Sequence, residues 1–304
     1  MQHSEPFLSV IVPTYARPQQ LATCLCALSQ QNYPRERFEV IVVNDGGTTL
    51  KSHLDAFLDR LNIKYIAQRH AGPANARNTG AEWAQGMFLV FTDDDCMPNS
   101  DWLQKLALRF AQTPTQIIGG RTLNALESNA YSTVSQAIID IAYSYYNAVP
   151  SQARFFASNN LAIPAAGFRE LGGFDTSFET SEDRNLCDRW LHCGYRMTYA
   201  AEAIVAHAHP LTLAGFCVQH FNYGRGAFRF HQFRAASGAE RLLPDWQFHL
   251  LVLRRFFAVP HLLPIWTMWH VANTAGFLWE MICRGSRSKQ LRVAYRRKDN
   301  ASVG

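Results

Sequence analysis

The sequence has few charged residues and almost no charge excess along most of its length. Charged side chains make up 17% of its 304 residues and hydrophobic ones 48%, which excludes an intrinsically disordered chain and suffices for a well-buried core. The net charge of +5 comes from the end of the chain, since residues 284–298 hold seven basic residues and no acidic one. The fold therefore lacks a basic footprint, and we expect no nucleic acid partner.

Several well-known signatures are also missing. The seven cysteines are scattered without a CxxC pair or a Cys/His cluster at zinc spacing, so we expect reduced thiols in a cytosolic protein. No GxxxxGK[ST] or GxGxxG segment is present, which argues against P-loop enzymes and dinucleotide oxidoreductases. The polar residues 1–6 do not resemble the start of a secretory signal peptide.

Short apolar runs alternate with segments of helical spacing in the first hundred residues. The pattern predicts strands at 7–12, 38–43, 63–66 and 87–91, and helices at 18–28, 50–61 and 74–83. This alternation is typical of an α/β fold with a mostly parallel central sheet flanked by helices. Ligands of such sheets bind beyond the carboxyl ends of the strands, so the polar residues 13–15, 44–45 and 93–95 should converge in one crevice.

Three consecutive aspartates, Asp93, Asp94 and Asp95, directly follow the fourth apolar run. Adjacent carboxylates repel one another, and burial at a strand end increases the cost of keeping them all ionised. A divalent cation relieves this repulsion, and Mg²⁺ typically binds one or two carboxylates together with substrate phosphates. The segment is therefore predicted to bind a metal. The alternative is an acidic turn before a helix that begins near Asp101.

Five segments together resemble glycosyltransferase family 2 and its GT-A fold. In chain order they are SVIVPTYARP, VVNDGG, AGPANARNTGA, FTDDDC and SEDRNLCDRW. The resemblance extends from about residue 7 to residue 209. It implies a GT-A catalytic domain over residues 1–210, with a nucleotide-binding part at about 1–100 and an acceptor-side part at about 101–210. Residues 211–304 are expected to form a C-terminal helical extension with an interfacial apolar segment and a basic tail.

The resemblance implies that the loops after the strands hold a nucleotide-sugar donor. The implied donor-binding residues are Pro13, Thr14, Tyr15, Arg17, Asp45, Arg77, Asn78, Asp93 and Asp94. Arginine suits a diphosphate because its guanidinium donates two parallel hydrogen bonds, whereas a surface ion pair is the alternative reading of Arg77. A carboxylate can accept an N–H from a pyrimidine base, although Asp45 is read nearly as well as a turn residue.

The same resemblance places a DxD motif on Asp93 and Asp95. Asp95 is then the direct metal ligand, and Asp93 binds the metal, its bound water or the ribose. His207 follows a short predicted strand where many such enzymes carry a metal-binding histidine, and His209 competes for that role. The implied cofactor is Mn²⁺ or Mg²⁺, with imidazole suiting Mn²⁺ better.

Asp183 matches the catalytic base of the family, at the start of a predicted helix over 183–193. The helix start offers N–H groups and a positive dipole end, so we expect the carboxylate to stay ionised and to take the proton of an acceptor hydroxyl. The alternative is an acidic residue that only stabilises the helix start. Asn159, Asn160 and Glu182 are implied on the acceptor side. One base opposite a departing diphosphate implies in-line displacement with inversion.

Residues 256–279 contain no charged side chain but are interrupted by Pro260 and Pro264. About 15 residues remain after the second proline, which is too short to cross a bilayer as one helix. We therefore expect a helix or hairpin lying in the membrane interface, with basic residues on both sides facing anionic lipid at the cytoplasmic face. An ordinary helix packed on the catalytic domain is the alternative.

The sequence thus predicts a metal-dependent, inverting glycosyltransferase. It would move one sugar from a nucleoside-diphosphate sugar, with a UDP-sugar favoured, to a glycan or lipid-linked acceptor. The Gln-x-x-Arg-Trp motif of processive polysaccharide synthases is absent, which favours single transfers. The alternatives are a sugar-phosphate nucleotidyltransferase and a non-catalytic, membrane-bound glycan-binding or scaffold protein.

Overall fold

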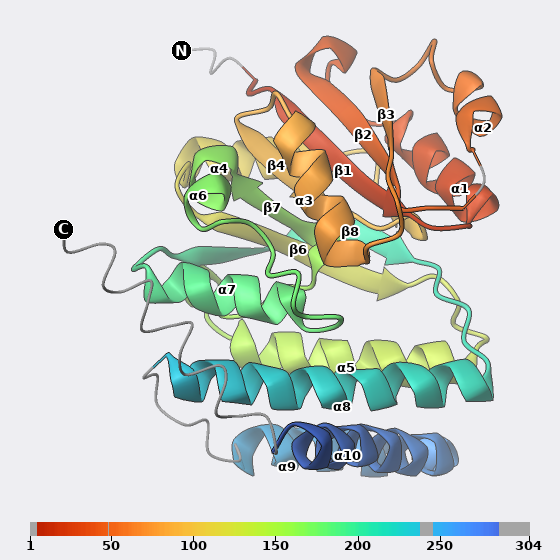
Figure 1. Cartoon of the computed structure of the whole chain (residues 1–304), viewed down its shortest axis with the longest axis vertical. Coiled ribbons are helices and arrows are strands. Elements are labelled where there is room, and N and C mark those ends of the chain that lie inside the picture. The colour runs from red at the N-terminus through yellow and green to blue at the C-terminus, as the bar shows by residue number, and fades with distance from the viewer. Residues whose placement is uncertain (1–4, 48, 238–245, 286–304) are drawn as a thin grey trace. The chain divides into compact units, whose positions relative to one another are not determined.

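The computed structural model describes residues 5–47, 49–237 and 246–285. The chain divides into two compact units, Met1–Pro210 and Leu211–Gly304 (Figure 1). The strands of the first unit are β1 Leu8–Thr14, β2 Phe38–Asn44, β3 Ile63–Ala67, β4 Phe88–Phe91, β5 Cys96–Pro98, β6 Ile117–Asn124, β7 Leu161–Pro164 and β8 Met197–His207. Its α-helices are α1 Pro18–Leu28, α2 Lys51–Asp55, α3 Pro73–Trp83, α4 Trp102–Gln112, α5 Ala130–Tyr146, α6 Ala165–Glu170 and α7 Glu182–His192. Short 3₁₀ turns cover Arg35–Arg37, Pro150–Gln152 and Ser158–Asn160.

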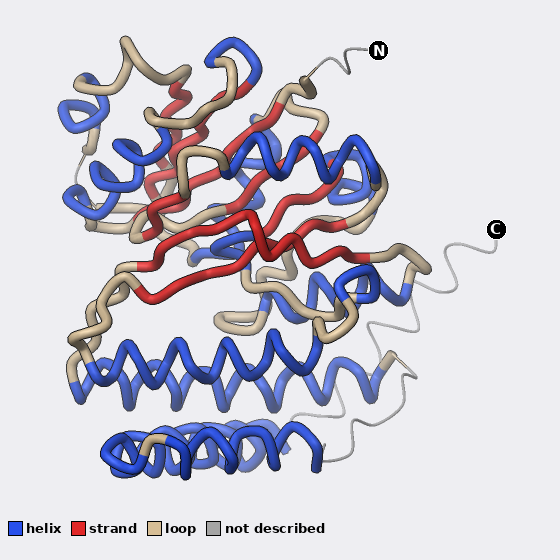
Figure 2. Tube along the Cα trace, turned by 180° about the vertical axis from the view of Figure 1, so that it is seen from behind, coloured by secondary structure: helices blue, strands red, loops and turns tan. Residues whose placement is uncertain are grey.

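Within the described residues the strands form one mixed sheet in the order β3-β2-β1-β4-β7-β6-β8-β5 (Figure 2). The part built from β3, β2, β1 and β4 is parallel, as the alternating sequence pattern predicts. Beyond β4 the sheet departs from that pattern, because β7 runs antiparallel to both β4 and β6, and β5 runs antiparallel to β8. The α/β prediction and its four strands are confirmed, and the second half of the sheet is mixed.

Side chains of the buried strands alternate between two hydrophobic cores, one on each face of the sheet. Val10 and Val12 of β1 point to the core that contains Leu21 and Leu25 of α1. Ile11, between them, points to the opposite core, which α3, α6 and α7 cover with side chains such as Trp190. Burial on both faces explains why these strands read as continuous apolar runs. The carboxyl ends of the parallel strands β1, β2, β3 and β4 lie at the same edge of the sheet.

The predicted helix over residues 50–61 is wrong in extent, since α2 ends at Asp55. The buried residues keep helical spacing through Phe57 and Leu61, which is why the sequence looks helical. The backbone instead forms i→i+3 turns, with the Phe57 amide 2.9 Å from the Leu54 carbonyl oxygen and the Arg60 amide 3.0 Å from that of Phe57. The side chains of Leu54, Phe57 and Leu61 thus pack into the core although the backbone does not form one continuous helix.

The second unit contains α8 Leu213–Ala236, α9 Trp246–Ala258, a 3₁₀ turn at Pro260–Leu262 and α10 Leu263–Gly285. Helices α8 and α10 approach closely at two glycines: a Cβ on Gly224 would lie 1.9 Å from the Asn273 carbonyl oxygen, and one on Gly276 1.9 Å from that of Phe221. Close approach at small residues is typical of tightly packed helix pairs.

A buried carboxylate also joins these two helices. Glu280 of α10 accepts hydrogen bonds from Arg225 Nε at 2.9 Å and Arg229 Nε at 2.7 Å, both on α8. This buried carboxylate and its two arginines join α8 to α10. Large apolar side chains face outward, with Phe257 73%, Trp279 57% and Ile282 71% exposed.

No single helix among the described residues is long and apolar enough to cross a membrane. The segments Leu250–Ala258 and Pro260–Cys283 meet the length and composition required only as a pair, and they are bent by 105° at the break between them. The break falls at the prolines of the predicted apolar segment. Most of the basic stretch over residues 284–298 lies outside the described residues.

Candidate active site

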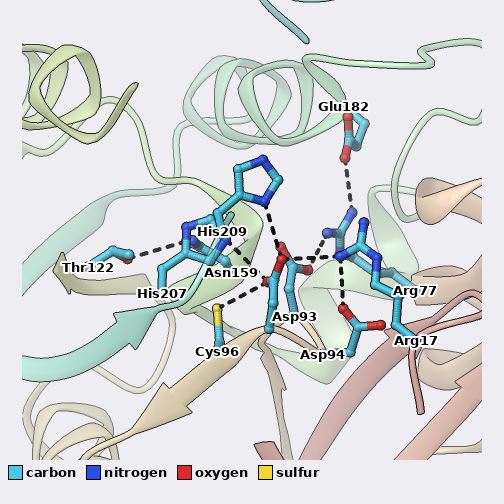
Figure 3. Close-up of polar contacts among 11 residues, drawn as sticks. Arg17, Arg77, Asp93, Asp94, Cys96, Thr122, Asn159, Glu182, His207 and His209 are labelled. Atoms are coloured by element: carbon cyan, nitrogen blue, oxygen red, sulfur yellow. Dashed lines mark hydrogen bonds and ion pairs between the residues drawn. The ribbon is translucent and has the colours of Figure 1, made fainter. Parts of the chain in front are cut away.

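The aspartates after β4 lie against two histidines that are more than a hundred residues away in sequence. Short β5 follows Asp95 directly and pairs with the end of β8, where Cys96 is opposite His207. This pairing places His207 Nε2 3.2 Å from Asp95 Oδ1 and His209 Nδ1 3.4 Å from Asp95 Oδ2 (Figure 3). The predicted pair of Asp95 and His207 is thus brought together, and His209 joins it instead of replacing His207.

Asp95, His207 and His209 each offer one ligand atom, and the three atoms lie within 4.8 Å of one another. Burial alone would raise the pKa of Asp95, but hydrogen bonds with the two histidines lower it well below its usual range. One ionised carboxylate and two imidazoles fit Mn²⁺ well, and the carboxylates next to Asp95 also suit Mg²⁺. The donor set therefore fits the predicted divalent metal.

Asp94 faces the loop after β1. Its Oδ2 accepts a 2.7 Å hydrogen bond from Thr14 Oγ1, and its Oδ1 lies 3.2 Å from Arg17 Nη1, which is also 3.1 Å from Asp95 Oδ2. Burial raises the pKa of Asp94 to about 6, although Thr14 and Arg17 act in the opposite direction. The ends of β1 and β4 meet here because the two strands are neighbours in the sheet.

Arg77 of α3 connects the aspartates after β4 to the start of α7. Its guanidinium is buried and bonds Asp93 Oδ1 at 2.6 Å and Glu182 Oε1 at 2.9 Å (Figure 3). Burial opposes the charge on Arg77, but the two carboxylates raise its pKa above the usual value. Glu182, predicted on the acceptor side, is buried in this ion pair. Burial and neighbouring Asp183 raise its pKa to about 7.

Asp183 lies in the first turn of α7 and is partly exposed. The residue before the helix, Ser181, has a φ of 71°, a left-handed conformation that costs free energy for a residue other than glycine. Burial raises the pKa of Asp183, whereas a 2.7 Å hydrogen bond from the Arg184 amide and the charge of Arg77 lower it. The helix start therefore does not outweigh burial, and the raised pKa moves this carboxylate towards the range useful to a general base.

Asp45, at the end of β2, organises the loop that follows β3. Its carboxylate accepts hydrogen bonds from Gln68 Nε2 at 2.7 Å and from the amides of Ala71 and Gly72 at 2.9 and 2.8 Å. His70 Nδ1 lies 2.9 Å from the same carboxylate. Asp45 is thus well placed at the predicted crevice but is already engaged by protein groups.

The sequence analysis missed Gln68 and His70 as members of the site. The His70 ring stacks on Tyr15, with a centroid separation of 4.4 Å, so the loops after β1 and β3 form one wall. Pro13, near the end of β1, is opposite Val43 of β2. The signal was available: residues 68–70 are the polar cluster at the carboxyl end of the third predicted strand, which was not counted with the other three.

Asn78, predicted to bind the donor, holds the loop before α7. Its Nδ2 donates to the Phe174 carbonyl at 2.8 Å, and its Oδ1 accepts from the Phe174 amide at 2.9 Å. A Cβ on Gly173 would come within 2.6 Å of Asn78 Oδ1, and Gly173 has a φ of 72°. Glycine is required at that position both for conformation and for space.

The two asparagines predicted on the acceptor side lie in the 3₁₀ turn before β7. Asn159 is nearly buried and accepts a 3.3 Å hydrogen bond from Thr122 Oγ1. Asn160 is fully buried, accepts from Trp102 Nε1 at 2.9 Å and donates to the carbonyls of Arg121 and Ala203 at 3.0 Å. With no exposed atom, Asn160 cannot contact an acceptor, so that prediction is wrong and the residue ties α4 to the sheet.

Residues 9–171, more than half of the chain, match the model of glycosyl transferase family 2. The chain belongs to glycosyltransferase family 2. It is therefore a glycosyltransferase, which sets aside the nucleotidyltransferase and the non-catalytic scaffold as alternatives.

Relatives of this glycosyltransferase carry sugar-transfer activities in their names. Glycosyltransferase AglE of Haloferax volcanii is 26% identical over 264 residues, which are 85% of this chain and 80% of the relative. Validoxylamine A glucosyltransferase of Streptomyces hygroscopicus subsp. jinggangensis is 29% identical over 240 residues, 69% of this chain and 54% of the relative. Pre-mycofactocin glycosyltransferase of Mycobacterium tuberculosis is matched over only 41% of its length, at 28% identity and 62% of this chain.

Solved structures show the same GT-A fold. Mannosyltransferase PcManGT of Pyrobaculum calidifontis, in complex with GDP-Man and Mn²⁺, aligns over 99% of this chain and 81% of its own, with a TM-score of 0.61 and 19% identity. TarS 1–349 of S. aureus, in complex with UDP-GlcNAc, aligns over 83% and 73% with a TM-score of 0.59 and 18% identity. At these identities the likeness shows the fold.

Proposed function

We propose that this glycosyltransferase is metal-dependent and inverting, and that it transfers one sugar from a nucleoside-diphosphate sugar. The observation that carries the proposal is the convergence of Asp95, His207 and His209 within 4.8 Å. Asp183, a partly exposed carboxylate whose pKa is raised, lies in the first turn of α7. The crevice would thus hold a divalent cation on one side and a general base on the other.

Asp183 would accept the proton of the acceptor hydroxyl while that oxygen attacks the anomeric carbon. The new glycosidic bond forms as the bond between the anomeric carbon and the diphosphate oxygen breaks, so the configuration inverts. Arg77 would hold Asp93 and Glu182 in place through its two ion pairs. A cation held by Asp95, His207 and His209 supplies Lewis-acid stabilisation of the leaving diphosphate.

The donor is a nucleoside-diphosphate sugar, with a UDP-sugar favoured. The structural neighbours support the class, since TarS is described with UDP-GlcNAc and PcManGT with GDP-Man and Mn²⁺. The wall formed by Tyr15 and His70 offers aromatic faces for a base, and Asp45 behind it supports the loop. Mn²⁺ suits the two imidazoles better than Mg²⁺ does.

A thermal-shift screen tests the donor. UDP-, GDP- and dTDP-sugars are each added with Mn²⁺, with Mg²⁺ and with EDTA. Ligands that bind only the folded protein raise its melting midpoint by mass action, so a UDP-sugar with Mn²⁺ should give the largest shift. Equal midpoints for all three donors, or shifts unaffected by EDTA, would contradict the proposed donor site.

We further propose that the second unit lies on the cytoplasmic face of a membrane and that the acceptor is a glycan or a lipid-linked sugar. Support comes from the exposed apolar side chains of this unit, Phe257, Trp279 and Ile282, while the carboxylate Glu280 is buried between helices. Apolar side chains facing outward, next to a basic stretch, suit an anionic lipid surface.

Polar substitution of the exposed apolar residues tests this attachment. The variant F257S/W279S/I282S should bind phosphatidylglycerol vesicles at least about tenfold more weakly in a sedimentation assay, because each apolar side chain contributes roughly 1.5–3 kcal/mol on burial. Leu108→Ser is the matched control, since Leu108 is 59% exposed on α4 of the other unit. Equal vesicle binding by wild type, triple variant and control would remove the membrane proposal.

A further inference from the structure

The guanidinium of Arg17 lies among the carboxylates that follow β4. Its Nη1 is 3.2 Å from Asp94 Oδ1 and 3.1 Å from Asp95 Oδ2, while the side chain remains 47% exposed. The same Asp95 Oδ2 lies 3.4 Å from His209 Nδ1. Asp95 Oδ2 therefore contacts both the Arg17 guanidinium and His209, which is one of the candidate metal ligands.

The backbone before Arg17 is held in a costly conformation. Ala16 has a φ of 54°, in the left-handed region that non-glycine residues rarely adopt. The next residues are Arg17 and Pro18, the first residue of α1. The chain thus turns sharply between β1 and α1, and Arg17 leaves that turn towards Asp94. Strain of this kind persists where the surrounding structure fixes it, and it is concentrated at functional sites.

A divalent cation bound to Asp95 Oδ2 would be repelled by the positive charge of the Arg17 guanidinium. Metal–oxygen distances for such ions are about 2.1 Å, so the cation would lie no more than about 5.2 Å from Arg17 Nη1. Like charges at that separation, in a partly buried site, repel strongly. Free cation and guanidinium therefore compete for the same carboxylates.

We propose that Arg17 makes this site selective for a divalent cation carried by a diphosphate over the free cation. A diphosphate brings negative charge and several acceptor oxygens, which give the guanidinium a new partner when the cation takes Asp95. Cation and nucleotide then bind cooperatively, and each raises the affinity for the other by the same factor. This inference rests on the proposed metal-dependent function and adds the residue that couples metal to nucleotide.

The coupling factor is measured directly by binding. Mn²⁺ affinity is determined by electron paramagnetic resonance with and without UDP, for wild type, Arg17→Gln and Arg17→Lys. Arg17→Gln should bind Mn²⁺ alone about tenfold more tightly than wild type, since the competing charge is gone. The factor by which UDP raises its Mn²⁺ affinity should also be at least about tenfold smaller than in the wild type. Arg17→Lys keeps the charge and should bind Mn²⁺ alone as wild type does.

Arg60→Gln is the matched control, because it removes the same charge from an exposed position beside the Phe57 ring. It should leave both Mn²⁺ affinities unchanged. If Arg17→Gln binds Mn²⁺ alone no more tightly than wild type, or if its coupling factor is unaltered, the role of Arg17 is overturned while the metal site stands. If wild type binds Mn²⁺ neither alone nor with UDP, the proposed metal-dependent function fails as well.

Discussion

Asp183→Asn is expected to lose sugar transfer by about 10³-fold or more in turnover while it keeps its affinity for the donor. A general base contributes roughly 10²–10⁴-fold to rate, and asparagine cannot accept the proton. Asn is close in size to Asp and keeps a side-chain oxygen, so the hydrogen bond from the Arg184 amide should survive. Single-turnover transfer and calorimetric donor binding, measured on the same preparation, separate the two effects.

Asp188→Asn is the matched control for that experiment. Asp188 is the third carboxylate of α7, about one and a half turns beyond Asp183, and lies 3.5 Å from His192 Nδ1. Its loss should leave turnover within about threefold of wild type, as is usual for positions that do not touch the reacting atoms. Retention of a tenth or more of the turnover by Asp183→Asn would show that another group takes the proton.

Asp95→Ala is expected to weaken Mn²⁺-dependent UDP binding at least about 100-fold. Even residues that only orient a metal ligand typically contribute 10–100-fold to metal affinity, and Asp95 is the carboxylate that both histidines face. Calorimetric titration of UDP in the presence of Mn²⁺, and again in EDTA, gives the metal-dependent part of the affinity. In EDTA the UDP affinities of the variant and of the wild type should be nearly equal.

The control here is Asp101→Asn. Asp101 is the next carboxylate along the chain and forms a partly exposed i,i+4 pair with Lys105 at 2.7 Å. Such pairs contribute little to stability, and this one lies outside the metal cluster, so UDP affinity should not change. If Asp95→Ala binds UDP with Mn²⁺ as tightly as wild type does, then either the metal binds at another site or UDP binding does not depend on a metal.

The parallel half of the fold could be predicted because its signals are local. Each apolar run ends in polar residues, and neighbouring parallel strands bring those ends together, as Thr14 and Asp94 show at 2.7 Å. Asp95 and His207 could be named from the sequence through the resemblance to the family, whereas His209 was expected to compete with His207 and joins it instead. Two prolines likewise marked the break between α9 and α10.

Features that depend on distant partners could not be predicted in the same way. Arg77 was read as a phosphate-binding residue, and nothing near it in sequence announces Glu182, which is 105 positions away. Asn160 looked like a polar residue in a loop, but three partners from separate elements bury it completely. Glu280 directly follows the uncharged segment over residues 256–279, and nothing near it in sequence announces the two arginines of α8 that bond it. Sequence periodicity predicts on which face of a helix or strand a residue lies, but it does not identify the distant residue that it contacts.

The pairing of β5 with β8 has a consequence for the order of events in folding. Asp95 and its histidines come together only when Cys96 is opposite His207 and the Ala208 amide bonds the Asp95 carbonyl at 2.8 Å. A growing chain that has not yet added residue 207 holds none of the imidazole ligands. Metal binding would therefore stabilise only the completed domain. The cation would then stabilise the folded domain only after β8, the last strand in the sequence, has paired in register with β5.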